Sequence, residues 1–187
     1  MQETDTDCGE YYLSAIELED KEAYAEYLND KVFNETLHFI PYPYTEMDAK
    51  RWIEHIRSRR MNLKDWTLAI RKSSDNKLIG EIGIYHSQLG SNGAVEISYW
   101  LAKHHWGQGI VTQAMLAFLD YCFEELDINC IFARVFDNNR RSWRVLEKTG
   151  FTFQGTFYNH LSKDDKYLND RVYKILKDDW VKFNEIN

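Results

Sequence analysis

A strand-like segment that runs into two glycines and then into a helix is the feature that most constrains this sequence. Residues 94–102 read AVEISYWLA, residues 104–109 read HHWGQG, and apolar residues recur at helical spacing from 109 to about 125. Glycines let the backbone approach an anion closely, and the first amides of the helix carry the positive end of its dipole. The turn at Gly107 and Gly109 therefore predicts a phosphate-binding helix N-terminus in an α/β chain.

Two common phosphate-binding motifs do not fit this turn. A P-loop requires GxxxxGK[ST], and no Lys-Ser or Lys-Thr follows these glycines. The dinucleotide fingerprint GxGxxG fails at its third glycine, where Thr112 stands. The turn alone thus indicates a phosphate compound without saying which one.

The rest of the chain alternates between strand and helix patterns. Thr45, with Asp48 three residues later, predicts a capping box at one helix start. The order predicts a mixed α/β sheet that is antiparallel in the first half and strand–helix–strand–helix–strand in the second. We expect a flexible tail at 1–10 and one domain at 11–187. The expected strands are 11–18, 66–72, 77–86, 94–102, 130–136, 151–159 and 170–177, and the expected helices are 20–29, 44–60, 109–125 and 139–150.

Residues 31–44 fit neither a strand nor a helix pattern. They hold both prolines of the chain, Pro41 and Pro43, among aromatic residues. A long aromatic loop in a compact domain is often functional, and a buried connector is the alternative.

Charge and composition restrict the partners. The net charge of −7 argues against a general nucleic-acid binder, and it either suits a cationic substrate or only maintains solubility. Because no apolar run is long enough to span a bilayer and the N-terminus is acidic, we expect a cytoplasmic protein without a membrane partner. Cys8, Cys122 and Cys130 show no CxxC spacing, so we expect reduced thiols and no zinc site.

A second motif, NRRSWRVLEKTGF at 139–151, begins with the N-cap residue Asn139 and ends with a C-terminal glycine, Gly150. Together, Trp106 to Thr112 and Asn139 to Phe151 resemble the GNAT superfamily of acyl-CoA-dependent N-acetyltransferases, most closely its RimJ/RimL-like branch. The resemblance implies the GNAT fold, in which two central strands, here 94–102 and 130–136, diverge and hold acetyl-CoA in the gap.

The resemblance also assigns residues to acetyl-CoA. Backbone amides from Gln108 to Thr112 would bind the pyrophosphate, and the backbone of 100–102 would pair with the pantetheine. The full set is Trp100, Leu101, Ala102, Trp106, Gly107, Gln108, Gly109, Ile110, Val111, Thr112, Asn139, Ser142 and Lys148.

The sequence departs from the family pattern at His104, where many members carry Arg or Gln. In an extended segment the rings of His104 and His105 should point apart, so we expect no two-histidine metal site and no metal.

Two residues are candidates for catalysis. The resemblance places Ser142 where its hydroxyl can donate to the CoA sulfur. Leu146 stands where other members carry a tyrosine that acts as the general acid. Glu96 on the strand 94–102 is the candidate base, because acetyl transfer needs a neutral amine. A structural salt bridge is the alternative role for Glu96, and Glu81 and Asp137 are reserve candidates.

The resemblance implies an N-acetyltransferase that uses acetyl-CoA and a primary amine, with a protein or peptide α-amino group as the expected acceptor. The alternatives are a small amine, such as a polyamine, an amino acid or an antibiotic, and a non-catalytic acyl-CoA-binding module. Dimers are frequent in the superfamily, which leaves a homodimer open. The acceptor should lie beside residues 31–44 and 157–170, with Phe39, Tyr42, Tyr44, Glu81 and Tyr158 as substrate-binding residues.

Overall fold

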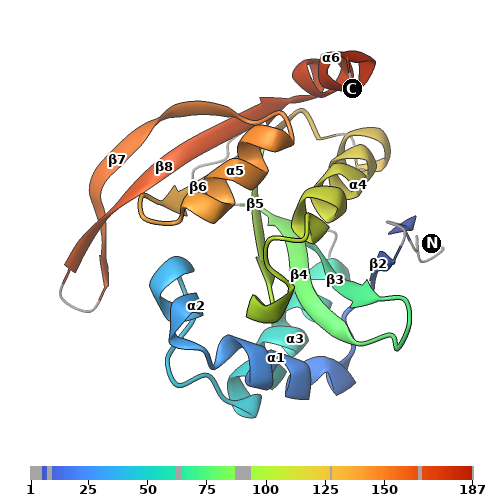
Figure 1. The fold of residues 1–187 in the computed structure, drawn as a ribbon, viewed down its shortest axis with the longest axis vertical. Helices are drawn as coiled ribbons and strands as arrows, with labels where there is room; N and C mark the ends of the chain where they lie inside the picture. Colours follow the sequence, from blue (N-terminus) through green and yellow to red (C-terminus); the bar gives the residue numbers. More distant parts are fainter. Residues whose placement is uncertain are drawn as a thin grey trace. The chain divides into compact units, whose positions relative to one another are not determined.

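A computed structural model describes residues 6–7, 10–61, 65–86, 94–126, 128–163 and 166–186. In these residues eight strands form one sheet in the order β1-β2-β3-β4-β5-β6-β8-β7 (Figure 1). The strands are β1 (Thr6–Asp7), β2 (Tyr11–Ser14), β3 (Asp65–Lys72), β4 (Leu78–Tyr85), β5 (Ala94–Leu101), β6 (Cys130–Phe136), β7 (Thr152–Lys163) and β8 (Lys166–Leu176). Because β5 and β6 are parallel and the neighbouring hairpins are antiparallel, the predicted mixed α/β sheet is confirmed.

Helices connect these strands. Among the described residues they are α1 (Lys21–Leu28), α2 (Lys31–Thr36), α3 (Glu46–Met61), α4 (Ile110–Glu125), α5 (Arg140–Lys148) and α6 (Lys177–Ile186), with 3-10 turns η1 (Leu18–Asp20) and η2 (Lys103–His105). None of the helices in this part of the chain is long and apolar enough to cross a membrane.

The chain divides into two compact units. The first comprises residues 1–85 and 98–120, and the second comprises residues 86–97 and 121–187. In the first unit, β1 to β4 form an antiparallel meander. The helices α1 and α3 lie side by side (Figure 1) and bury a core with Tyr24, Phe33, Tyr44, Ile53 and Trp100.

Capping residues set the helix starts of the first unit. At α3 the amide of Thr45 donates to Asp48 at 3.0 Å and the amide of Asp48 donates to the Thr45 hydroxyl at 3.3 Å, which confirms the predicted capping box. At α2 the Asp30 side chain accepts from the amide of Val32 at 3.0 Å.

The helix α2 corrects the interpretation of residues 31–44 as wholly irregular. Six residues are too few to show helical periodicity, and Val32, Asn34 and Thr36 have low helix propensity. Burial of Phe33, which is 3% exposed, stabilises the helix through tertiary packing instead. Residues 37–44 are irregular, with a cis peptide bond between Tyr42 and Pro43.

In the second unit, β6 pairs with β5 on one side and with β8 on the other. The parallel pairing runs from Ala94↔Cys130 to Glu96↔Phe132, and the antiparallel pairing with β8 runs from Cys130↔Leu176 to Phe136↔Asp170. The hairpin β7–β8 is longer than the predicted strands 151–159 and 170–177.

The helix α6 was not predicted. It starts one residue after β8 and buries Trp180, which is stacked on Phe183. The thiol of Cys122 is buried and that of Cys130 is half-buried, and both are free as predicted, while Cys8 lies outside the described residues.

Candidate functional site

The glycine turn between β5 and α4 has the conformation that its sequence predicts. Gly107 and Gly109 have φ of +78° and +81°, a left-handed region that side chains with a Cβ rarely adopt. A Cβ built on either residue meets no protein atom within 4 Å, so the space over the turn is open. The helix α4 begins directly afterwards at Ile110, and the amides of its first turn have no acceptor within the helix. The turn therefore fits an anion such as a pyrophosphate.

Side chains of the first unit hold this turn in place. The indole nitrogen of Trp106 donates to the carbonyl of Leu101 at 2.7 Å, and its ring lies 6.0 Å from that of Phe33 in α2. Gln108 Nε2 donates to the carbonyl of His104 at 3.3 Å. The turn is thus tied both to the end of β5 and to α2.

The backbone geometry at the end of β5 indicates which of residues 100–102, all predicted to pair with the pantetheine, can do so. The amide of Ala102 donates to Ile79 of β4 at 2.8 Å, and a Cβ at Gly80 of β4 would lie 2.5 Å from the carbonyl oxygen of Trp100. Because backbone groups of successive residues point to opposite edges of a strand, Trp100 and Ala102 face β4 and the amide of Leu101 faces the other edge. Of the three predicted residues, Leu101 is the one placed to pair with a ligand.

The prediction that the two histidine rings point apart is wrong. Residues 103–105 form a 3-10 turn instead of an extended segment, which brings the ring centroids of His104 and His105 to 4.3 Å. His104 also contacts the ring of Tyr27 edge-on. Burial is the main cause of the lowered pKa of His105. Across the residues that the structure describes, no group of three His, Cys, Asp or Glu side chains could hold a metal ion.

A buried carboxylate, Glu81, lies at the centre of an aromatic cluster in the first unit. Glu81 is 4% exposed, and its Oε2 accepts from the hydroxyl of Tyr24 in α1 and from the indole of Trp52 in α3, the latter at 2.8 Å. The ring of Tyr24 meets that of Trp100 edge-on at 5.2 Å. Burial raises the pKa of Glu81, while hydrogen bonds from Tyr24, Trp52 and Trp100 act in the opposite direction.

The predicted substrate-binding residues divide between this cluster and the surface. Tyr44 is buried, and its pKa is raised by burial and by the charge of Glu81. Phe39 and Tyr42 of the same loop are 77% and 53% exposed. Tyr158, which belongs to β7 in the second unit, is 76% exposed.

The other predicted carboxylate, Glu96, has a different environment in the second unit. Its side chain is 3% exposed, and the Arg134 guanidinium binds both of its oxygens, at 2.8 and 3.1 Å. Arg134 also lies 3.9 Å from the fully buried Asp170, which in turn lies 3.7 Å from His160. A bidentate ion pair engages both oxygens of the carboxylate, which favours the structural role for Glu96.

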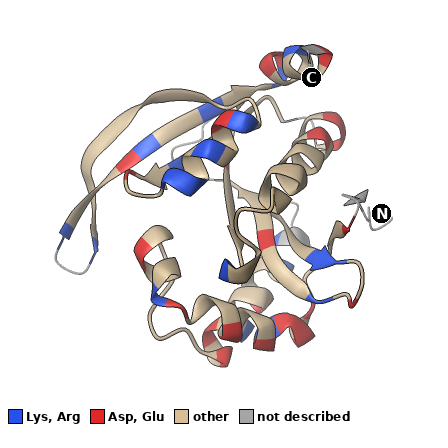
Figure 2. Cartoon of the chain, viewed as in Figure 1, with Lys and Arg blue, Asp and Glu red and all other residues tan. Residues whose placement is uncertain are grey.

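The second motif forms α5, whose Asn139 is the predicted N-cap. Its side chain accepts from the amide of Ser142 at 3.3 Å, and Ser142 is half-buried in the first turn. Leu146 is fully buried, and Lys148 is exposed in the last turn. Asp137, the other reserve base, is exposed. Figure 2 shows several Lys and Arg positions along α5.

The comparisons with known proteins agree with these features. A sequence profile of the acetyltransferase (GNAT) domain matches residues 11–152. The chain belongs to the GNAT acetyltransferase family. It is therefore an acyltransferase enzyme, and its fold is the one that the sequence motifs predicted.

Three similar proteins illustrate the range of the family. The probable N-acetyltransferase YjcK of Bacillus subtilis is 32% identical over 136 residues, which cover 73% of this chain and 75% of YjcK. The putative ribosomal N-acetyltransferase YdaF of the same organism is 33% identical over 106 residues, 57% of each chain. The structure of RimL, a ribosomal L7/L12 alpha-N-protein acetyltransferase in complex with coenzyme A, matches with a TM-score of 0.81 at 18% identity, over 91% of this chain and 97% of RimL.

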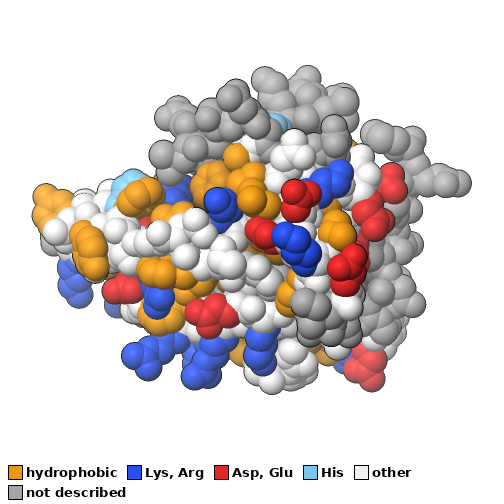
Figure 3. Space-filling model, turned by 90° about the horizontal axis from the view of Figure 1, so that it is seen from above, with side chains coloured by type: hydrophobic (Ala, Val, Ile, Leu, Met, Phe, Trp, Pro, Cys, Tyr) orange, Lys and Arg blue, Asp and Glu red, His pale blue; other side chains and the backbone are white. Residues whose placement is uncertain are grey.

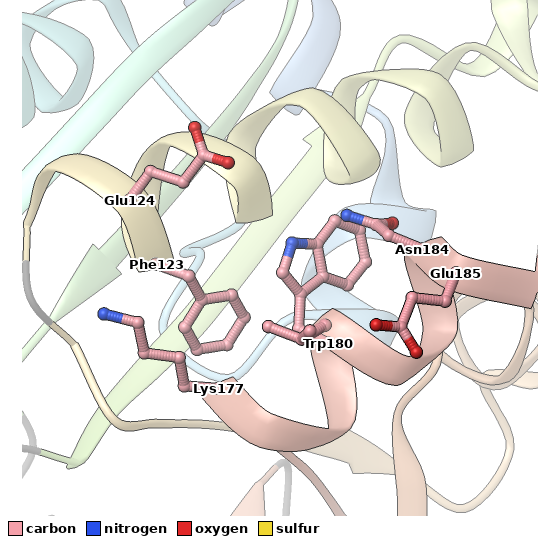
Figure 4. Close-up of a pocket in the computed structure, with 7 residues that line it drawn as sticks. Phe123, Glu124, Lys177, Trp180, Asn184 and Glu185 are labelled. Carbon is pink, nitrogen blue, oxygen red and sulfur yellow. The ribbon is translucent and has the colours of Figure 1, made fainter.

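The second unit of the acetyltransferase also has a surface pocket. It has a volume of about 310 Å³ and lies between the end of α4 and α6 (Figure 4). Its lining residues are Phe123, Glu124, Lys177, Trp180, Val181, Asn184 and Glu185, none of which was predicted for the site. On the face of the molecule drawn in Figure 3, hydrophobic side chains lie among Lys and Arg side chains.

Sequence reasoning missed three side chains that act on the candidate carboxylates of this acetyltransferase. Tyr24 lies 57 positions from Glu81, and no local pattern connects them. Trp52 lies 29 positions from Glu81, and its indole reaches the carboxylate only in the folded chain. Arg134 follows from strand register, because it lies two residues beyond Phe132, the partner of Glu96. Only a correct alignment of β5 with β6 could have identified it.

Proposed function

We propose that this GNAT acetyltransferase transfers an acetyl group from acetyl-CoA to the α-amino group of a protein or peptide. The observation that carries the proposal is the glycine turn at the start of α4, open to a ligand, in the same unit as a buried carboxylate with neutral donors. The coenzyme A bound in RimL and the ribosomal acceptors named for RimL and YdaF support the cofactor and the acceptor class.

The residues of the turn fit the pyrophosphate of acetyl-CoA. Amides from Gln108 to Thr112 would donate to its oxygens, and the outward-facing amide of Leu101 would hold the acetyl oxygen. Bound acetyl-CoA supplies an acetyl group activated as a thioester. The remaining contacts predicted for Asn139, Ser142 and Lys148 belong to the second unit and stay predictions.

We assign the role of base to Glu81 in place of Glu96. Glu81 has a raised pKa and accepts hydrogen bonds from uncharged donors, whereas Arg134 occupies both oxygens of Glu96. The Glu81 carboxylate takes a proton from the acceptor's ammonium group, which frees the nitrogen lone pair. The neutral amine then forms the N–C bond as the C–S bond breaks. The nitrogen loses its second proton to solvent, and the Ser142 hydroxyl is the predicted proton donor to the departing sulfur, with its own proton restored from solvent.

A thiol-release assay with acetyl-CoA tests the proposal. The acceptors are peptides with free or blocked N-termini, together with a polyamine, an amino acid and an aminoglycoside. We expect turnover with free N-terminal peptides only, and a fall of about 100-fold or more in turnover for Glu81→Gln, since general base catalysis contributes at least that much. Ser142→Ala should lower turnover without changing CoA affinity.

Other outcomes of this assay would change the acceptor class or the function assigned to the chain. Turnover with the small amines and none with peptides would replace the acceptor class. CoA binding without turnover on any acceptor would indicate a binding module.

Gly109→Val places a β-branched residue at φ +81° in the space over the turn, so we expect CoA affinity to fall at least tenfold. Gln108→Ala, which keeps the amide, is the matched control, and unchanged affinity in Gly109→Val would refute the pyrophosphate assignment.

A further inference from the structure

Three indole and phenol groups surround Glu81, and their geometry suggests more than packing. The hydroxyl of Tyr24 and the indole of Trp52 converge on the same oxygen, Oε2, from two different helices. Tyr24 is fully buried, and its ring is held edge-on against Trp100. Because α1 and α3 hold these two donors in place, rotation of the carboxylate would break both hydrogen bonds, and its orientation is fixed.

We infer that Tyr24 and Trp52 are positioning residues that keep the Glu81 carboxylate ionised and oriented toward the acceptor's proton. The inference rests on the proposed function, in which Glu81 is the base. It extends that function by naming two residues, on α1 and α3, that act through Glu81 on the reaction.

The physical reason is a balance between burial, which disfavours the charged form of Glu81, and hydrogen bonds, which stabilise it. A carboxylate that is 4% exposed is poorly solvated, which disfavours its charged form. A protonated Glu81 could not accept a further proton, so burial works against the base. Neutral donors, among them Tyr24 and Trp52, stabilise the charged form without forming the permanent ion pair that Arg134 makes with Glu96.

Both donors are well placed to be tested separately. The burial of Tyr24 beside Glu81 raises the pKa of its hydroxyl well above the ordinary value, so it stays protonated and able to donate. Trp52 is 37% exposed, so replacing it does not open the core. The other titratable groups of the cluster are Tyr44, from the loop before α3, and Asp20, whose charge acts on Tyr24.

The test is the pH profile of kcat/KM with one peptide acceptor for wild type, Tyr24→Phe, Trp52→Phe and Tyr27→Phe. Losing a donor to a charged group should move the acidic limb to higher pH by on the order of one unit, with the rate at high pH retained. Tyr27→Phe removes a hydroxyl of the same apolar core that contacts Lys77 instead of Glu81, and it should leave the limb in place.

Failure of the inference and failure of the base assignment give different results. If Glu81→Gln is inactive but Tyr24→Phe and Trp52→Phe keep the wild-type limb, the base stands and the positioning role is refuted. A uniform rate loss at every pH in both variants also refutes it, because it would indicate packing alone. If Glu81→Gln retains full activity, the base assignment itself fails. Trp52→Phe keeps the test decisive should Tyr24→Phe not fold.

Discussion

Glu81 and Glu96 are both almost fully buried carboxylates, and their partners separate their roles. Glu81 accepts from the neutral donors Tyr24 and Trp52, whereas Glu96 faces a guanidinium that binds both of its oxygens. At Glu96 the Arg134 guanidinium engages both oxygens, so an amine would have to compete with a permanent charge for the carboxylate.

The ion pair predicts how Glu96→Gln behaves. The substitution leaves the Arg134 charge, at a side chain that is 11% exposed, with the more distant Asp170 as its counter-charge, so we expect a loss of up to about 3–5 kcal/mol in the free energy of unfolding. Urea unfolding followed by tryptophan fluorescence measures it. The acidic limb of the pH profile should stay where it is in the wild type. A shifted limb with unchanged stability would instead return the role of base to Glu96.

At the scale of elements, strong local signals predicted structure well. The strand 130–136 and the glycine turn into α4 were found, since a run of apolar β-formers and a glycine pair are local features. The helix α2 was missed because Phe33 stabilises it by burial rather than by pattern. The site follows the same rule: Gly107 and Gly109 were found from the motif, but Tyr24 and Trp52 reach Glu81 only through the fold.

The N-cap of α2 allows an element-scale prediction. Asp30 accepts from the amide of Val32 and pairs with Lys103 at 2.8 Å. Asp30→Ala should cost about 1 kcal/mol of unfolding free energy at pH 7, the usual value of a lost cap. Asp30→Asn keeps a capping oxygen and serves as the matched control. Equal losses for the two variants at pH 7 would show that the contact with Lys103, and not the cap, matters.

The same residue predicts a pH dependence. The hydrogen bond from Lys103, and then that from Val32, lowers the pKa of Asp30. A lowered pKa in the folded state means that the carboxylate stabilises the protein above its unfolded pKa of about 3.9, and that this contribution is lost as pH falls through the folded pKa. The stability of wild type should therefore converge on that of Asp30→Asn in acid. Urea unfolding of both proteins between pH 7 and pH 3 measures the convergence.

At the scale of the whole molecule, measurements of thermal stability can separate ligand binding from catalysis. A ligand that binds only the folded state stabilises it according to its concentration, by about 2.7 kcal/mol at 100 times its Kd. For a chain of 187 residues this corresponds to a rise in Tm of roughly 5–10 °C. Binding at the glycine turn does not require the base, so the two functions should respond to different substitutions.

We therefore expect coenzyme A to raise the Tm of wild type and of Glu81→Gln by the same amount, and to raise the Tm of Gly109→Val by clearly less at the same concentration. Differential scanning fluorimetry over a series of CoA concentrations measures the shift, and the apo Tm of each variant is its own reference. Glu81→Gln should combine a full shift with lost turnover, because the carboxylate acts on the amine and the turn acts on the pyrophosphate. A full shift in Gly109→Val would place the CoA phosphates away from α4. A lost shift in Glu81→Gln would mean that Glu81 supports CoA binding, and the role of base would then have to be assigned to another residue.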